Sequence, residues 1–224
     1  MERWDAQGNV YLVSEPFGAT PARVRELAGD ADGILEVAAD GGVTIWNPDG
    51  STAELSGNGT RIAAAWLAAR TGAEEVVVRS AGREVRVRAR GDGMFEQELG
   101  PVRVGPAEEV DGIRFVPVDV GNPHAVVEGD PNELPRIGPL LETHPRFPGR
   151  TNVQVARVEA AGRVRARVWE RGAGETASSG TSAVAVAAAL VGDGEVTVSF
   201  PGGELVVVLV GGRATLVGPA RRVD

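Results

Sequence analysis

The chain carries one short arrangement twice, once in each half, and this repeat constrains its fold more than any other feature. Trp46 lies ten residues before the turn Ser56-Gly57-Asn58-Gly59, and Trp169 lies ten residues before Ser179-Gly180-Thr181. An apolar, alanine-rich segment follows each turn. A Gly-Asn pair also opens each half ahead of a strand-like run, at residues 8–9 and 121–122. Since these elements recur in the same order, we interpret them as an internal duplication.

The pattern within each half predicts many short strands and one buried helix. Residues 60–70 and 181–191 are rich in alanine and are followed by Gly72 and Gly192, which is typical of helices with glycine ends. Another helix is predicted after Thr20-Pro21, up to Gly29. We therefore predict an α+β fold of two pseudo-symmetric lobes, each a wrapped β-sheet or barrel around a central helix. The strand candidates are residues 34–37, 43–46, 76–78, 85–89, 94–99, 116–120, 125–128, 153–158, 164–169, 196–200, 205–210 and 214–217.

A segment containing proline and glycine, residues 100–112, is the best candidate for the boundary between the lobes. We expect an N-terminal lobe of residues 1–112 and a C-terminal lobe of residues 113–224, with the last strand able to return to the first lobe. Duplicated lobes commonly hold a small ligand in the cleft between them, so a small-molecule site is expected there.

Charge and missing residue types exclude several classes of function. The net charge of −8 argues against nucleic acid as a partner. Two arginine runs, residues 83–90 and 163–167, alternate with apolar residues, which favours a solvated strand face over a phosphate track. The chain has no lysine, so a pyridoxal phosphate Schiff base is excluded, and no cysteine, which excludes disulfides, thiolates and cysteine-bound metal.

We expect no metal, because the two histidines, His124 and His144, stand apart without a metal-binding spacing. No apolar run is long enough to cross a membrane, and the N-terminus does not resemble a signal peptide. The expected location is therefore the cytoplasm, without a membrane partner.

The two glycine turns are candidate anion sites. Glycine lets the backbone turn tightly and leaves N–H groups exposed at the start of the following helix, where the helix dipole favours a carboxylate. A carbanion beside that carboxylate would be stabilised by the same field. Either turn alone is explained as well by a serine that caps a helix. Their symmetric pairing favours a carboxylate site with Ser56 and Ser179 at its mouth.

The residues of both turns resemble a known family. Trp46 to Ser51 and Ser56-Gly57-Asn58-Gly59-Thr60-Arg61 are similar to the first signature of the diaminopimelate epimerase family, which normally reads Cys-Gly-Asn-Gly. Residues 170–181 resemble the second signature, which normally ends Ala-Cys-Gly-Thr/Ser-Gly. Gly121-Asn122-Pro123-His124 and residues 140–152 are also similar. The resemblance covers nearly the whole chain and implies a cofactor-independent epimerase of the α-carbon of an amino acid, with LL-diaminopimelate as the default substrate.

The resemblance also implies a role for each matching residue. The N–H groups of the helix starts would bind the carboxylate at the reacting carbon, Glu170 would face the ammonium group, and His124 and Glu170 would lie close to the proton-transfer pair. The residues expected to bind the carboxylate are Gly57, Asn58, Gly180 and Thr181. Those expected to hold the ends of the substrate are Asn9, Asn47, Asn122, Asn152 and Arg171.

The departure from the family is at the centre, because Ser56 and Ser179 stand where two cysteines act as base and acid. A thiol has an ordinary pKa of about 8.5, and an alcohol lies several units higher. At about 1.4 kcal/mol per pKa unit, a five-unit handicap costs ~7 kcal/mol against proton abstraction, of which the stronger basicity of an alkoxide returns a part. We predict a severe loss of epimerase activity relative to a cysteine enzyme.

Two alternatives stay open beside the epimerase. One is a catalytically silent homologue that binds an amino acid or dicarboxylate, and the other is a related isomerase or dehydratase of the proline racemase type. Ile62, after Arg61, and Ser182 also depart from the family pattern, which favours natural divergence over deliberate replacement of the cysteines. The family commonly forms homodimers, but the tail at residues 221–224 lacks the usual aromatic contact, so a homodimer is left open.

Overall fold

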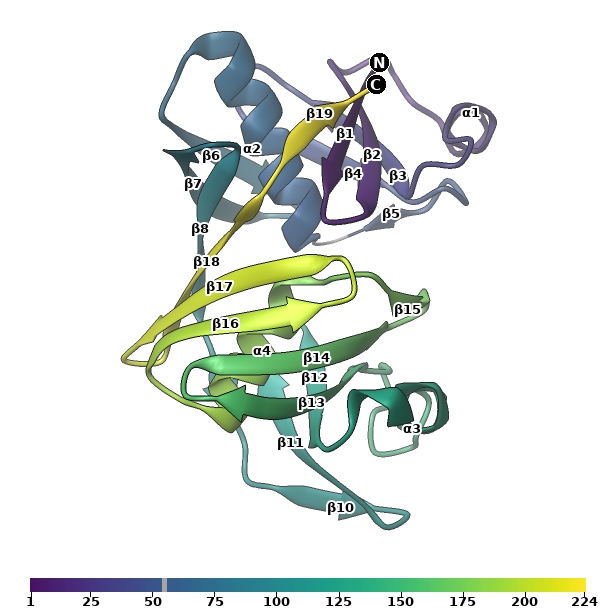
Figure 1. Cartoon of the computed structure of the whole chain (residues 1–224). Coiled ribbons are helices and arrows are strands. Elements are labelled where there is room, and N and C mark those ends of the chain that lie inside the picture. The colour runs from purple at the N-terminus through teal and green to yellow at the C-terminus, as the bar shows by residue number, and fades with distance from the viewer. Residues whose placement is uncertain (54–55) are drawn as a thin grey trace. The chain divides into compact units, whose positions relative to one another are not determined.

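A computed structural model describes residues 1–53 and 56–224 and divides into two compact units (Figure 1). Unit 1 comprises Met1–Glu98 and Val217–Asp224, and unit 2 comprises Leu99–Leu216. The predicted α+β fold of two lobes is confirmed, since each unit consists mostly of strands around one buried helix. Among the helices that the structure describes, none combines the length and apolarity needed to span a membrane.

Unit 2 begins at Leu99, and the boundary at residue 112 stays a prediction from the sequence. The strands β9 (Arg103–Val104) and β10 (Glu108–Val110) both pair with β11 (Ile113–Asp119), so residues 99–112 belong to unit 2. The last strand, β19 (Arg221–Val223), pairs with β1 (Glu2–Ala6) and therefore lies in unit 1.

In unit 1, strands surround the helix α2 (Gly57–Thr71), which contacts β1, β2, β3, β4, β6 and β7. The helix is buried from Gly57 to Leu67, on all of its faces, and ends at Gly72 in the left-handed conformation, as the sequence predicts. Figure 1 shows α2 between the β6–β8 strands and the sheet that holds β1 and β2. The other elements are β2 (Asn9–Ser14), α1 (Pro21–Leu27), β3 (Gly33–Val37), β4 (Val43–Trp46), β5 (Thr52–Ala53), β6 (Glu75–Ser80), β7 (Arg83–Gly91) and β8 (Met94–Pro101).

Unit 2 has the same plan around the helix α4 (Gly180–Leu190), which contacts β11, β12, β13, β14, β16 and β17. This helix is buried from Gly180 to Ala187, and it packs in a core of valine, alanine and leucine side chains from the surrounding strands. The other elements are β12 (Pro123–Glu128), η1 (Pro131–Glu133), α3 (Leu134–Glu142), β13 (Asn152–Ala160), β14 (Arg163–Glu170), β15 (Gly174–Thr176), β16 (Gly194–Phe200), β17 (Gly203–Val210) and β18 (Arg213–Pro219).

The strand pairing confirms the duplication that the sequence predicts. In unit 1, β1 pairs antiparallel with β2, β2 runs parallel to β3, and β3, β4 and β5 pair antiparallel in turn. In unit 2, β11 to β15 repeat this order with the same directions. An antiparallel hairpin then follows each central helix, formed by β6 and β7 in unit 1 and by β16 and β17 in unit 2.

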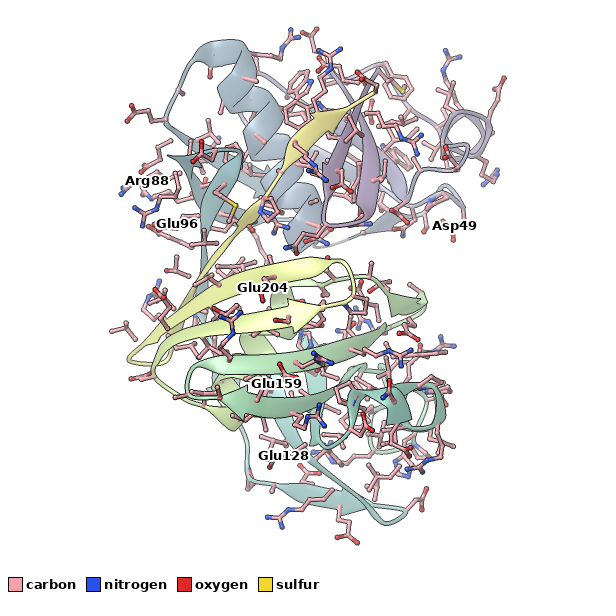
Figure 2. The ribbon with its side chains drawn as sticks, in the orientation of Figure 1. Asp49, Arg88, Glu96, Glu128, Glu159 and Glu204 are labelled. Carbon is pink, nitrogen blue, oxygen red and sulfur yellow. The ribbon has the colours of Figure 1, made fainter. Side chains whose placement is uncertain are left out.

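The two arginine runs lie on solvated strand faces, as predicted. On β7, Val85 and Val87 are buried while Arg86 and Arg88 are exposed and share Glu75 of β6 as an ion-pair partner. Figure 2 shows Arg88 and Glu96 on the exposed side of unit 1, where the register of β7 and β8 pairs them. The arginines of β14 pair in the same way with Glu159, Glu175 and Glu204. In each run, these arginines are therefore paired with carboxylates along one solvated strand face.

The helix α3 was not predicted, because Pro139 and Gly138 lie inside it and obscure the helical pattern. Its apolar residues Leu134, Ile137 and Leu141 are nevertheless spaced for one helix face, and all three are buried. The helix crosses between the parallel strands β12 and β13, the place that α1 occupies between β2 and β3.

We predict that Gly138→Ala destabilises the protein, although alanine is the better helix former. A Cβ atom at position 138 would lie 2.8 Å from the Cβ and Cγ atoms of Trp169, which is too close for either residue to stay in place. The gain in helix propensity is about 1 kcal/mol, and overpacking costs about 1–3 kcal/mol. We therefore expect the free energy of unfolding to fall by about 1 kcal/mol, and by at most about 2 kcal/mol.

Urea denaturation measures this loss. Gly149→Ala is the matched control, since a Cβ atom there meets nothing within 4 Å, and we expect its free energy of unfolding to stay within about 0.5 kcal/mol of the wild type. Equal stability of the two variants would contradict the packing argument.

Candidate functional site

In unit 1, the predicted serine turn forms the start of α2. Ser56 has an extended backbone, its Oγ accepts the N–H of Gly59 at 2.9 Å, and its carbonyl oxygen accepts the N–H of Thr60 at 2.8 Å. The N–H groups of Gly57 and Asn58 precede the first intrahelical hydrogen bond. They are the two groups that the family resemblance assigns to a carboxylate, and both residues are buried.

A fully buried arginine stands behind this turn. The guanidinium of Arg61 donates to Asn58 Oδ1 at 2.9 Å, to Gln97 Oε1 at 3.2 Å and to the carbonyl oxygen of Pro219 at 2.8 Å. Gln97 in turn donates to the carbonyl oxygen of Gly57 at 3.0 Å. Burial lowers the pKa of Arg61 to about 10, so its charge persists at neutral pH. This charge adds to the helix dipole and favours an anion at the start of α2.

The predicted residues Asn9 and Asn47 lie at one end of the unit 1 sheet. Asn9 begins β2 and Asn47 follows β4, and the pairing of Tyr11 with Gly33 and of Ile34 with Trp46 places these strand ends together. Asn47 donates its side-chain N–H to Ser51 Oγ at 2.9 Å, which fixes the turn after β4. The hydroxyl of Tyr11 lies 3.4 Å from Ser56 Oγ, so the start of α2 is at the same end.

In unit 2, the second serine turn forms the start of α4, with a different use of the hydroxyl group. Ser179 is 5% exposed and has an extended backbone. Its carbonyl oxygen accepts the N–H of Ala183 at 3.0 Å. Its side chain makes no capping hydrogen bond in the described structure. The N–H groups of Gly180 and Thr181 precede the intrahelical bonds, as do those of Gly57 and Asn58 in unit 1. Ser179 therefore has a hydroxyl that the helix cap does not engage.

His124 is held in a buried hydrogen-bonded chain in unit 2. Gln154 Nε2 lies 3.0 Å from His124 Nδ1 and donates to Ser182 Oγ at 2.9 Å, while His124 Nε2 lies 3.0 Å from Asn122 Oδ1. With the amide nitrogen of Gln154 as donor, Nδ1 is the acceptor and Nε2 carries the proton. Burial lowers the pKa of His124 to about 3, although the contact with Gln154 opposes the shift. The imidazole is therefore neutral at neutral pH, and it orients Asn122.

Other predicted residues of unit 2 gather at the same end of its sheet. Asn152 donates its side-chain N–H to the carbonyl oxygen of Pro123 at 2.9 Å and accepts the backbone N–H of Arg171 at 3.0 Å. Glu170 Oε1 accepts the hydroxyl of Thr176 at 2.7 Å, and Asn122 Nδ2 lies 3.5 Å from Thr181 Oγ1. The amide of Asn152 is therefore engaged in fixing the end of β14, from which Glu170 and the exposed Arg171 project.

Each unit thus brings its own predicted residues together. Unit 1 holds Ser56, Gly57 and Asn58 near the strand ends that carry Asn9 and Asn47. Unit 2 joins Asn122 with His124 and Thr181, and Asn152 with Arg171, around the start of α4. In the described part of the chain, no group of three or more His, Asp and Glu side chains is arranged to hold a metal ion.

No role for Tyr11, Arg61, Gln97 or Gln154 was predicted from the sequence. One signal was present for Tyr11, because it follows Gly8-Asn9 at the distance at which His124 follows Gly121-Asn122. Arg61 belongs to the first turn motif, but its burial and its hydrogen bonds to Asn58, Gln97 and Pro219 depend on the tertiary packing. The two glutamines lie far from both turns in the sequence and carried no signal.

Diaminopimelate epimerases resemble this chain over most of its length. The family model described as diaminopimelate epimerase matches residues 116–223. The diaminopimelate epimerase of Thioalkalivibrio sulfidiphilus is 34% identical, over 96% of this chain and 94% of the relative. The diaminopimelate epimerase of Xylella fastidiosa is 41% identical, over 96% of this chain and 90% of the relative. That of Pseudomonas syringae pv. tomato is 37% identical, over 80% of this chain and 75% of the relative.

Solved structures share the fold at lower identity. A Pseudomonas aeruginosa protein described as a predicted epimerase has a TM-score of 0.78 at 18% identity and covers 100% of this chain and 96% of its own. A hydroxyproline epimerase from Agrobacterium vitis, with bound trans-4-hydroxy-L-proline, has a TM-score of 0.69 at 17% identity. The match covers 100% of this chain and 90% of that protein. A PhzF-family phenazine biosynthesis protein from Bacillus anthracis has a TM-score of 0.75 at 12% identity. The match covers 100% of this chain and 96% of that protein.

The burial of neutral His124 predicts a loss of stability in mild acid. A histidine in the unfolded chain has a pKa of about 6.5, so below that pH the unfolded chain binds a proton that the folded chain refuses until about pH 3. The contribution of neutral His124 to the free energy of unfolding is complete above pH 6.5 and is lost as the pH falls toward 3. Between pH 8 and pH 5, we expect the free energy of unfolding to fall by about 2 kcal/mol through His124.

Chemical denaturation at a series of pH values measures this slope. His124→Gln should remove it, whatever the absolute stability of that variant, and His144→Gln is the matched control that should keep it. The prediction fails if the slope between pH 8 and pH 5 is the same in the wild type and in the His124 variant.

Proposed function

Because this chain belongs to the diaminopimelate epimerase family, we propose that it inverts the α-carbon of an amino acid without a cofactor, converting LL- to meso-diaminopimelate by default. In this proposal Ser56 and Ser179 take the two proton-transfer positions, on opposite faces of one α-carbon. The observation that carries the proposal is the repeated helix start. In each unit a serine, half-buried at Ser56 and buried at Ser179, precedes two buried residues whose backbone N–H groups open the helix.

The helix starts are suited to the step in which the α-proton is removed. Removing the α-proton places negative charge on the carbon and on the carboxylate beside it. The N–H groups of Gly57, Asn58, Gly180 and Thr181 would bind that carboxylate, and their dipoles are fixed before the reaction because both helices are buried. The buried cation Arg61 strengthens the same preference for negative charge at the start of α2.

The remaining residues would recognise the substrate. Glu170 offers a carboxylate to an ammonium group and is held by the hydroxyl of Thr176. Arg171 offers a guanidinium to a distal carboxylate and is held through its backbone by Asn152. We assign Asn9, Asn47 and Asn122 to the ends of the substrate, and His124 to the orientation of Asn122 in its neutral form.

A second candidate function follows from the serine hydroxyls. An alcohol is a poor acid and base near neutral pH, and Ser56 already accepts a capping hydrogen bond from Gly59. A protein with this chemistry could bind the amino acid or dicarboxylate and leave its α-proton in place. Exchange of the α-proton with solvent separates this silent binder from an epimerase.

We predict slow deuterium incorporation at the α-carbon when the protein is incubated with LL-diaminopimelate in heavy water. Changing Ser56 and Ser179 together to cysteine should raise the exchange rate on the order of 10²–10⁴-fold, because the lower pKa of a thiol removes most of the handicap. NMR or mass spectrometry measures the incorporation, and calorimetry measures binding.

Ser199→Cys is the control for an added thiol, since it places sulfur on β16 instead of at a helix start, and it should leave the rate unchanged. Saturable binding without exchange in the wild type and in the double cysteine variant would establish the silent binder. Absence of both binding and exchange would refute the assignment of the site.

A further inference from the structure

The phenol of Tyr11 touches one of the two candidate proton-transfer groups. Tyr11 is the single tyrosine of the 224-residue chain, and its side chain on β2 is 6% exposed. Its hydroxyl donates to Ser56 Oγ across 3.4 Å, while Ser56 Oγ also accepts the N–H of Gly59 at 2.9 Å. The contact is longer than an ordinary O–H···O bond, as contacts between catalytic groups often are before substrate binds.

The backbone holds the tyrosine ring against the sheet. Tyr11 pairs with Trp4 on β1 and with Gly33 on β3. A Cβ atom on Gly33 would lie 2.8 Å from Tyr11 Cε1 and 2.2 Å from the carbonyl oxygen of Trp46, so the ring occupies space that only a glycine leaves open. The hydroxyl is therefore aimed at Ser56 by close packing and does not depend on a flexible side chain.

The duplication places Tyr11 where unit 2 has His124. Both residues follow a Gly-Asn pair by the same distance, and both lie opposite the first residue of the next parallel strand, Gly33 in unit 1 and Asn152 in unit 2. The side chain at this position is hydrogen-bonded to Asn122 and Gln154 in unit 2. In unit 1 the corresponding side chain reaches the serine itself, so the two units differ in what the side chain at this position contacts.

We propose that Tyr11 and Ser56 form a proton relay for inversion at the α-carbon, an inference that rests on the proposed function. In one direction, Tyr11 is a phenolate. Ser56 Oγ takes the α-proton as its own hydroxyl proton passes to the Tyr11 oxygen, so the C–H bond breaks and the negative charge moves from the phenolate to the carbanion. In the other direction, the Tyr11 hydroxyl gives its proton to Ser56 as Ser56 protonates the carbanion. Each step conserves protons and charge and needs no further reactant.

A phenol removes most of the handicap of the alcohol. Phenols ordinarily have a pKa of about 10, within about two units of a thiol, whereas an alcohol lies several units higher. Among the described residues, each ionisable side chain on β1, β3 and α2, the elements packed against β2, has a hydrogen-bond partner of its own. On β1, Glu2 accepts a hydrogen bond from Trp66, Arg3 donates to Asp30, and Asp5 accepts the N–H of Gly8. On β3, Glu36 accepts from Trp46. On α2, Arg61 donates to Asn58 and Arg70 donates to Glu15.

A double-mutant cycle tests the relay through its dependence on the alcohol. Tyr11→Phe keeps the ring over Gly33 and removes the hydroxyl. In the wild-type background we expect the α-deuteration rate to fall by about 10²-fold or more, the usual worth of a proton-transfer group. In the Ser56→Cys background, where a thiol replaces the alcohol, we expect Tyr11→Phe to change the rate by less than about threefold. An equal loss in both backgrounds would show a packing role and overturn the relay.

Failure of the relay and failure of the proposed function give different results in this experiment. If the wild type exchanges no α-proton while the Ser56→Cys, Ser179→Cys variant does, the relay is overturned and the site assignment stands. If no variant exchanges the proton, the epimerase function itself is refuted, and the relay with it.

An optical titration tests the contact without relying on activity. Because the chain has one tyrosine, phenolate absorbance near 295 nm reports Tyr11 alone, and Tyr11→Phe gives the blank. Ser56→Ala removes the hydroxyl that would donate to the phenolate, so we expect the midpoint of ionisation to rise by about half a pH unit or more. The midpoint of the wild type should also coincide with the midpoint of its exchange rate against pH. Equal midpoints in wild type and Ser56→Ala would overturn the relay.

Discussion

The burial of the two central helices is the constraint on which the rest of the structure depends. A helix that is apolar on all sides needs strands around it, and α2 and α4 each contact strands before and after them in the chain. Burial extends to their first residues, where backbone N–H groups lack intrahelical partners. Those groups need an acceptor, so the interior of each unit ends in a place suited to an anion.

The two units meet this constraint with different electrostatics. In unit 1, Ser56 caps the helix, and the buried charge of Arg61 stands behind the turn with neutral hydrogen-bond acceptors around it. In unit 2, the hydroxyl of Ser179 makes no capping bond in the described structure, and the neighbouring chain of Gln154, His124 and Asn122 is neutral. The duplication preserved the backbone plan while the side chains that tune proton affinity diverged.

Much of the fold could be predicted from local patterns. The alternation of valine and arginine predicted β7 and β14 because each strand has one face in the core and one in solvent. Glycine ends and alanine content predicted α2 and α4. The helix α3 was missed because its proline and glycine weaken the helical signal, although Gly138 is there to accommodate the ring of Trp169. The strands β1 and β19 were missed because their short, polar segments carry no strand pattern of their own. Pairing defines them, that of β1 with β2 and that of the edge strand β19 with β1.

The sequence by itself determined the repeat, the strand–turn–helix units, the family and the identity of the serines, because these depend on spacing and residue type along the chain. Only the tertiary structure decided which side chains surround each serine. Tyr11 and Ser56 are 45 residues apart in the sequence, and Arg61 and Pro219 are 158 residues apart. Packing brings them together, and burial then sets their chemistry: the same imidazole or guanidinium has a different proton affinity once water is removed from it.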